Sequence, residues 1–146
     1  TRCSRDWSSD VCSSDLTSGA HFYTVGQRKG LNIGGHQEPL FILGTDVARN
    51  IIYVGEGTEH PGLFRPGLFV AAEEIHWIRT DLKMQIGEER SYQVRIRYRQ
   101  PIEKATLYRR DEGMYMLFDN EQRGVTSGQF AAWYDGDELI GSGMIF

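Results

Sequence analysis

The residues most suited to chemistry lie in the stretch 91–99, where arginines alternate with apolar side chains. Every second position from 95 to 99 is basic, giving Arg95, Arg97 and Arg99. Alternate side chains of a β-strand share a face, so a strand here would present three guanidinium groups in a row, about 6.6 Å apart. Guanidinium groups suit bidentate contacts with phosphate. The row therefore indicates a polyanion site, or else a solvated face whose arginines pair with carboxylates of a neighbouring strand.

Two glycine-containing loops carry further polar side chains. The loop 26–35 holds Gln27, Arg28 and Lys29 behind a glycine, and glycines let backbone N–H groups approach an anion closely. It matches neither the P-loop nor the dinucleotide pattern, and a plain surface turn is an equal interpretation. The polar stretch 121–129 is long for a hairpin connection and ends at Gln129. Loops on rigid β scaffolds often carry recognition residues, although this one could be an ordinary connection.

The sequence predicts no catalytic centre and no metal site. Both cysteines, Cys3 and Cys12, precede residue 16, so the rest of the chain has no thiol nucleophile or ligand. No serine has the context of a nucleophile elbow. The histidines lack the spacing of metal ligands; they are His21, His36, His60 and His76.

Composition and charge favour a folded protein with a local binding patch. The chain has 146 residues, 40% of them hydrophobic and 12% aromatic, which is not a disordered composition. The net charge of −4 excludes a protein coated in positive charge, so nucleic acid would have to bind a local basic surface. We expect no signal peptide, no membrane span and a cytoplasmic location.

The first sixteen residues differ in character from the rest. They repeat the triplet Ser-Ser-Asp and have no apolar period of 2 or 3.6 residues. The segment resembles a translated sequencing adapter joined to a truncated reading frame; the alternative is a genuine flexible tail. We therefore expect residues 1–16 to be non-native or disordered.

The remainder is predicted to be mainly β. Short apolar or alternating runs separated by turn residues are typical of a small barrel or sandwich. The stretch 68–78 is apolar with a Glu-Glu break, and its pattern does not decide between helix and strand. The turn-rich stretch 55–62 is the candidate boundary between domains spanning 17–60 and 61–146. The other expected strands cover 22–25, 40–43, 51–54, 91–99, 105–108, 114–118, 130–134 and 138–145.

Four stretches, taken in order, resemble the tRNA-specific 2-thiouridylases. They are FYTVGQRKGLNIGG at 22–35, YVGEG at 53–57 followed by a His-Pro pair, RIRYRQP at 95–101, and QRGVTSGQ at 122–129 followed by Tyr-Asp-Gly. The resemblance implies a partial small central β domain and then a C-terminal six-stranded type of β-barrel, similar to domain 2 of elongation factor Tu. It covers about residues 19–146.

In that family the enzyme uses ATP with Mg²⁺ to activate the wobble uridine of tRNA, and a persulfide sulfur carrier then supplies sulfur. The nucleotide motif Ser-Gly-Gly-x-Asp-Ser is absent from this chain, and Cys12 lies in the foreign-looking segment. The resemblance therefore implies that this part of the enzyme supplies tRNA binding rather than catalysis. The alternatives are a stand-alone RNA-binding barrel and a protein-interaction domain.

The resemblance also implies roles for particular residues. Family tRNA contacts fall on Arg97, Tyr98 and Gln129, with Arg95 and Arg99 nearby; Gln27, Arg28 and Lys29 would face the catalytic domain or the tRNA. Two departures from the family pattern are Ser127, where proline is usual, and Gly124, where a small apolar residue is usual. Strict alternation would bury Tyr98 while exposing Arg97, so a joint RNA contact requires a bulge or a strand end, which the nearby Pro101 favours.

Overall fold

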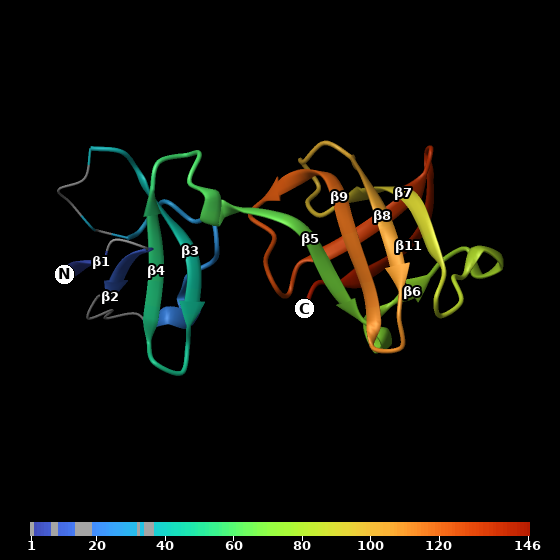
Figure 1. The fold of residues 1–146 in the computed structure, drawn as a ribbon, viewed down its shortest axis with the longest axis horizontal. Coiled ribbons are helices and arrows are strands. Elements are labelled where there is room, and N and C mark those ends of the chain that lie inside the picture. The colour runs from blue at the N-terminus through green and yellow to red at the C-terminus, as the bar shows by residue number, and fades with distance from the viewer. Residues whose placement is uncertain (1, 7–8, 14–18, 32, 34–36) are drawn as a thin grey trace. The chain divides into compact units, whose positions relative to one another are not determined.

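The protein is built from β-strands. A computed structural model describes residues 2–6, 9–13, 19–31, 33 and 37–146, which form a four-stranded and a seven-stranded sheet (Figure 1). The described residues contain short 3-10 turns but no α-helix, and none of their helices could cross a membrane. The chain divides into two compact units, Thr1–Phe64 and Arg65–Phe146. The expectation of a mainly β protein is confirmed.

The first unit contains an antiparallel sheet with the strand order β1-β2-β4-β3. A tight hairpin joins β3 and β4, and Asn50 in its turn has a positive φ of 57°. The Asn50 side chain also accepts a hydrogen bond from the backbone N–H of Ala20 at 2.7 Å, which ties the preceding segment to the hairpin. The strands are β1 (Arg2–Asp6), β2 (Ser9–Ser13), β3 (Leu40–Asp46) and β4 (Ile51–Glu56).

One part of this unit differs from expectation. The stretch 22–25 is not a strand: a 3-10 turn, η1 (Ala20–Phe22), comes first, and Phe22 is 68% exposed. The described residues of the first segment form β1 and β2, and the expectation of a non-native or disordered segment stays a prediction. Strand β2 pairs with β4 through Val11 and Cys12, and such edge pairing uses backbone groups, so it needs no apolar periodicity. A foreign origin of this segment stays a prediction.

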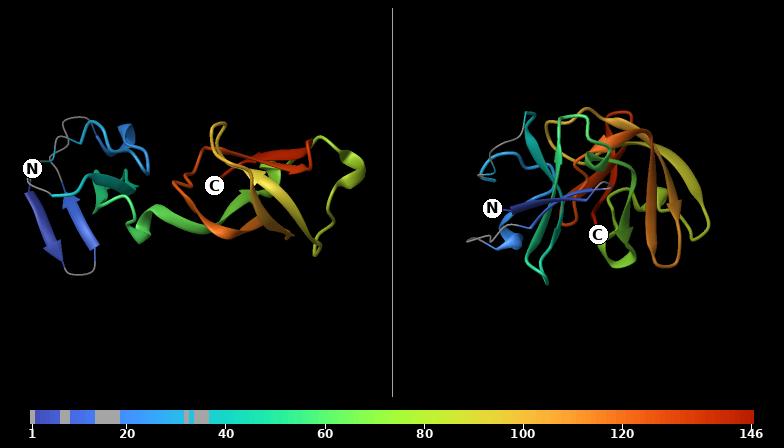
Figure 2. Two further views of the ribbon diagram at one scale, coloured as in Figure 1. Left: turned by 90° about the horizontal axis from the view of Figure 1, so that it is seen from above. Right: turned by 60° about the vertical axis from the view of Figure 1, so that its left-hand side comes forward.

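The second unit curls one antiparallel sheet toward a barrel. Its strand order is β5-β9-β8-β7-β10-β11-β6 (Figure 1). Val70 near the end of β5 forms a bridge with Ile145, which directly follows β11, so the sheet closes on itself there. Figure 2 gives two further views of the strands. The strands are β5 (Phe64–Ala71), β6 (His76–Trp77), β7 (Glu89–Arg95), β8 (Glu103–Arg109), β9 (Gly113–Arg123), β10 (Phe130–Asp135) and β11 (Glu138–Met144).

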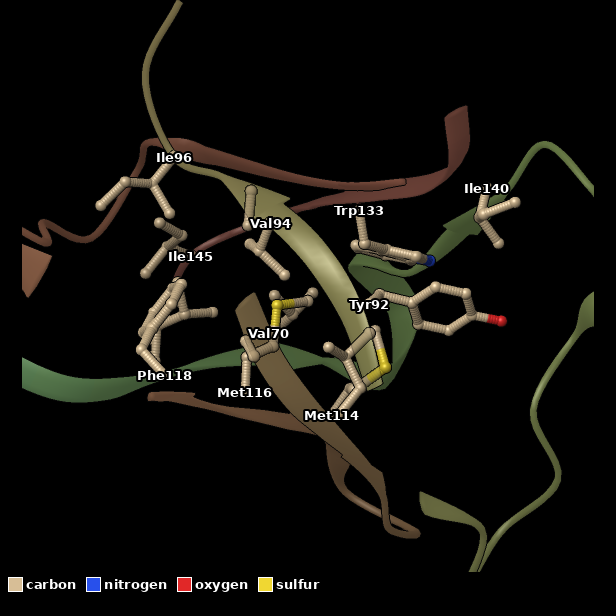
Figure 3. Packing of buried hydrophobic residues seen from close by; sticks show 14 of the residues in the cluster. Val70, Tyr92, Val94, Ile96, Met114, Met116, Phe118, Trp133, Ile140 and Ile145 are labelled. Atoms are coloured by element: carbon tan, nitrogen blue, oxygen red, sulfur yellow. The ribbon is translucent and has the colours of Figure 1, made fainter. Parts of the chain in front are cut away.

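Apolar side chains from alternate strand positions fill the inside of this curled sheet. On β9, Met114, Met116 and Phe118 are buried while the residues between them are exposed, as alternation predicts. Figure 3 shows these side chains meeting others from β5, β7, β10 and the segment after β11. The fully buried Trp133 packs edge-on against Trp77 at 5.5 Å between ring centroids. Aromatic pairs in this geometry add to the free energy of apolar burial.

The stretch 68–78 combines both structures that its pattern left open. Strand β5 ends at Ala71, a 3-10 turn η3 (Ala72–Glu74) holds the Glu-Glu break, and the two-residue strand β6 follows. Strand β5 lies so close to the start of β9 that a Cβ on Gly113 would be only 2.2 Å from the carbonyl oxygen of Val70. Only glycine permits this approach of the two backbones.

Candidate nucleic-acid interface

The arginine row does not lie on one strand. Strand β7 ends at Arg95, four residues before the expected end, and a turn closed by the Gln100 N–H on the Arg97 carbonyl (3.1 Å) follows. The chain must reverse here, because β8 begins at Glu103 and pairs back along β7. Pro101 lies in the reversal, and it has no N–H to donate to a ladder. The strand prediction for 91–99 is therefore wrong beyond Arg95.

This early strand end exposes the side chains that the turn carries. Tyr98 is 90% exposed, and Arg97 and Arg99 are also exposed, whereas Arg95 is half-buried opposite Ala132 of β10. The strand end predicted near Pro101 thus lets Arg97 and Tyr98 face solvent together. None of the three arginines forms an ion pair with a carboxylate of the described residues. The alternative interpretation, in which these arginines pair with carboxylates of a neighbouring strand, is therefore excluded for the described residues.

Arg97 instead contacts the loop between β9 and β10. Its Nη2 donates to the carbonyl oxygen of Gly124 at 2.7 Å. The Gln129 amide is oriented with Oε1 toward Arg97, because the reverse orientation would oppose donors to donors. In this orientation Oε1 accepts from Nη2 at 3.0 Å and from Nε at 3.2 Å. One edge of the guanidinium thereby joins residues that are 27 and 32 positions away in the sequence.

The loop has little freedom to move away from Arg97. The Gly128 N–H donates to the Ile145 carbonyl at 2.8 Å, and the Ile145 N–H donates to the Gln129 carbonyl at 2.7 Å. At the other end, Gly124 has a φ of 69°, and a Cβ there would lie 2.9 Å from Arg97 Nη2. We call residues 97–100 together with 124–129 the turn–loop surface. Its backbone is fixed by hydrogen bonds on both sides.

A glutamine pair links the turn to β9. Gln100 Nε2 donates to Gln122 Oε1 at 2.6 Å, and Gln122 Nε2 donates to the Asn120 carbonyl at 2.7 Å. Gln122 is only 4% exposed, which makes it the one buried polar side chain among the residues that the structure describes. Neither Gln100 nor Gln122 was predicted as a site residue from the sequence. Glutamine is usually a surface residue, so neither position carried a signal.

The other predicted site residues belong to the first unit. Gln27 is used within its own loop: Oε1 accepts from the Thr24 N–H at 3.1 Å, and Nε2 donates to the Lys29 carbonyl at 2.9 Å. The loop is attached to β3, because the Gly26 N–H donates to the Ile42 carbonyl at 2.7 Å. Arg28 and Lys29 are exposed. Gln27 therefore shapes the loop that presents the two cations.

Perturbed pKa values occur away from the turn–loop surface. Hydrogen bonds to Asp81 and Glu138 raise the pKa of Arg79, and the same contact lowers the pKa of the Asp81 carboxyl. Asp81 lies on the 3-10 turn η4 (Thr80–Leu82), Arg79 directly precedes this turn, and Glu138 begins β11. They form an exposed ion-pair cluster, which is a structural feature of the unit rather than an acid–base centre.

The residues present do not fit ATP or its metal ion. The chain has no glycine-rich phosphate loop of a known pattern. Over the described ranges, no group of three histidine, cysteine or acidic side chains could hold a metal ion. His36 lies outside the described residues.

Comparison with known proteins assigns both parts of the chain. Residues 69–145 match the family model described as the aminomethyltransferase beta-barrel domain, and residues 17–56 match the tRNA methyl transferase PRC-barrel domain. A protein of Christiangramia forsetii named tRNA-specific 2-thiouridylase MnmA is 54% identical over 127 residues, which are 87% of this chain and 32% of that protein.

Proteins of the same name from two other bacteria are also similar. The Flavobacterium johnsoniae protein is 56% identical and the Karelsulcia muelleri protein 46% identical, each over 127 residues and 87% of this chain. The matches cover 32% and 33% of those proteins, so the chain spans about a third of their length. The chain therefore belongs to the tRNA-specific 2-thiouridylase family, of which it carries the central and C-terminal β domains.

Proposed function

We propose that this chain supplies tRNA binding to a longer 2-thiouridylase, and that the turn–loop surface is where the tRNA binds. The longer enzyme would thiolate the wobble uridine in the cytoplasm, using ATP with Mg²⁺ and a persulfide sulfur carrier. ATP and Mg²⁺ would bind outside this chain, which has no phosphate loop of a known pattern. The relatives are named for action on tRNA, and this supports the choice of ligand.

The observation that carries the proposal is the group of exposed cations beside an exposed ring. Arg97 and Arg99 have no carboxylate partner among the described residues, although the chain as a whole has a net charge of −4. Guanidinium groups of this kind contact phosphate oxygens. Tyr98, 90% exposed between them, offers a face on which an unpaired base can stack.

The roles divide among the side chains by their remaining hydrogen-bonding capacity. Arg97 uses its Nε and Nη2 on the loop, so its two Nη1 donors remain for one phosphate oxygen. Arg99 has no partner among the described residues and can contact phosphate with a full edge of its guanidinium. Arg95 is half-buried at the end of β7, and its charge adds to the positive potential of the turn–loop surface. Arg28 and Lys29 form a second, separate basic site for the tRNA or the catalytic domain.

The test is tRNA binding by the 146-residue chain over a range of salt concentrations. We expect Arg99→Gln to weaken binding and to lower the slope of log K against log salt by about 0.7–0.9, the value for one lost phosphate contact. Tyr98→Ala should cost about 1–3 kcal/mol with little change in slope, because stacking releases no counterions.

The matched control is Arg110→Gln. Arg110 is also exposed, but it lies in the β8–β9 hairpin, at the end of β8 far from the turn. Removing it changes the net charge by the same amount without touching the turn–loop surface. Equal affinities and equal slopes for Arg99→Gln and Arg110→Gln would refute the proposal.

Protein binding is a second candidate function. Tyr115 and Leu117 on β9 are 40% and 49% exposed, and they line a groove together with Phe69 and Phe146. Exposed apolar side chains gathered in this way are typical of contact with another protein. A partner captured equally well at low and high salt, and lost in Leu117→Lys but not in Arg99→Gln, would favour this function.

A further inference from the structure

A hollow on the outer face of the second unit is lined by three neighbouring strands. Its volume is about 350 Å³, which is within the range of small-ligand sites. Gln93 of β7 lies at its centre, and the register places Lys104 of β8 on one side of Gln93 and Tyr134 of β10 on the other. Gln93 points outward because it alternates with the buried Tyr92 and Val94, and its partners in the register share that face. The row therefore presents an ammonium group, an amide and an aromatic ring.

Strand β10 leaves room on both sides of Tyr134. Ala132, two positions before it, has a small side chain, and Gly136, two positions after it, has none. A Cβ added to Gly136 would meet no atom within 4 Å, so the hollow is open at this end. Tyr134 itself is half-exposed, and the flat ring of a planar ligand could lie against it.

The charged side chains of the hollow lie on opposite sides of it. Lys104 is on β8 and Asp135 ends β10, so β7 lies between them and about 9–10 Å separates their strands. Neither side chain forms an ion pair with any of the described residues. Arg95 lies diagonal to Lys104, and its buried Nε has no hydrogen-bond partner within the described part of the chain. The hollow therefore suits a ligand with an anionic group at one end and hydrogen-bond donors at the other.

We propose that this hollow binds one nucleotide unit, a nucleoside 5′-monophosphate that is either free or an unpaired residue of a bound RNA. The phosphate contacts Lys104 and Arg95, the base stacks on Tyr134, and the Asp135 carboxylate accepts a hydrogen bond from the edge of the base. Strand β7 runs from the hollow directly into residues 97–100, so one RNA strand can reach both places. For a nucleotide within tRNA the inference rests on the proposed function, to which it adds a site that reads a base.

The carboxylate of Asp135 determines which bases the hollow accepts. An ionised carboxylate only accepts hydrogen bonds, and cytosine offers it the N4 amino group. Uracil has a carbonyl oxygen in the place of that amino group, which would oppose the carboxylate. We therefore expect cytidine 5′-monophosphate (CMP) to bind about tenfold more tightly than uridine 5′-monophosphate (UMP).

The first test titrates the 146-residue chain with CMP and UMP and follows the NMR signals of the residues that line the hollow. In Asp135→Asn the side-chain amide both donates and accepts, so the preference for CMP should fall below about threefold. The matched control is Asp137→Asn, which removes the same charge from an exposed position two residues away, outside the hollow. Equal affinities of the wild-type chain for CMP and UMP, or the same loss of preference in Asp137→Asn, would overturn the assignment of the base edge.

The second test removes the phosphate contact and the ring. We expect Lys104→Gln and Tyr134→Leu each to weaken CMP binding about tenfold, through a lost charge-assisted hydrogen bond and lost stacking. Lys83→Gln is the control for charge, because Lys83 is exposed at the end of η4, outside the hollow. The inference is overturned if the wild-type chain does not bind CMP, or if Lys104→Gln and Lys83→Gln bind it equally well.

Competition with tRNA distinguishes the two sources of the nucleotide. If CMP displaces tRNA from the wild-type chain and does so less well from Lys104→Gln, the hollow binds a nucleotide of the RNA. If CMP binds while tRNA affinity is unchanged by CMP, Lys104→Gln and Asp135→Asn, the hollow binds a free nucleotide.

The hollow and the turn–loop surface fail differently in these experiments. If Arg99→Gln and Tyr98→Ala weaken tRNA binding but CMP does not bind, the proposed function stands and the nucleotide inference fails. If CMP binds as expected but neither of those two variants affects tRNA, the proposed function fails and the hollow remains. Urea midpoints equal to that of the wild-type chain establish that each variant is folded.

Discussion

Removing the buried Gln122 amide should destabilise the second unit and loosen the turn that carries Tyr98. In Gln122→Ala, the hydrogen bonds at 2.6 Å from Gln100 and at 2.7 Å to the Asn120 carbonyl are both lost. Each is neutral and contributes about 0.5–1.5 kcal/mol. The lost methylene adds about 0.8 kcal/mol, since Gln122 is buried. Gln100 and Asn120, which lose these hydrogen bonds, are partly or fully exposed, so water can satisfy their polar groups. The free energy of unfolding should therefore fall by about 2–4 kcal/mol.

Two companion variants identify the source of this loss. Gln122→Met keeps most of the side-chain volume and should recover about 1 kcal/mol relative to Gln122→Ala, because it replaces only the apolar part. Gln100→Ala should cost about 1–3 kcal/mol, because it leaves the Gln122 Oε1 without a partner in a buried position. Combining Gln100→Ala with Gln122→Ala should cost less than the sum of the two.

The assay is urea unfolding followed by tryptophan fluorescence, to which the buried Trp133 and its neighbour Trp77, two of the three tryptophans of the chain, contribute from the second unit. A limited tryptic digest would report cleavage after Arg97 and Arg99, and we expect faster cleavage in Gln122→Ala because the turn loses its link to β9. An effect below 0.5 kcal/mol, or strictly additive effects of the two alanine substitutions, would show that the glutamine pair does not stabilise the unit.

Two further predictions concern other parts of the second unit. Gly113→Ala should lower the free energy of unfolding by at least about 1–3 kcal/mol, because its Cβ would lie 2.2 Å from the Val70 carbonyl oxygen; an unchanged urea midpoint would contradict this close approach. Arg79 holds the pKa of Asp81 below its ordinary value of 3.8, so their contact stabilises the folded chain above that pH and is lost as the pH falls through the lowered pKa. Asp81→Asn should therefore lower the urea midpoint at pH 7 and have progressively less effect below pH 3.8, whereas a difference that grows on acidification would contradict the assignment.

Much of the fold followed from patterns that depend on one strand alone. The run 114–118 predicted a strand, and β9 contains it, with Met114 and Met116 on its buried face. The run 22–25 has equally good strand composition but forms no strand; the residues that follow it, Gly26 and Gln27, form the hydrogen bonds to Ile42 of β3 instead. Strand composition does not tell which residues of a segment will pair with a neighbour, and it did not predict that β2 pairs with β4.

The site was predictable as a set of residues and not as an arrangement. The resemblance identified Arg97 and Gln129, which are 32 positions apart, but their contact arises only when β7, β9 and β10 bring two connections together. The end of β7 at Arg95 was the decisive unknown, because a strand that continued three residues further, through position 98, would have turned Tyr98 inward. Gln100 and Gln122 could be recognised only from their burial and their contact.

The hydrogen bonds that shape the turn–loop surface join residues between 97 and 145, all of which belong to the second unit. A protein engineer could therefore graft the second unit onto another protein and keep the shape of this surface. Substitutions elsewhere in the sequence leave these hydrogen bonds in place, so the surface can stay the same while other parts of the chain diverge.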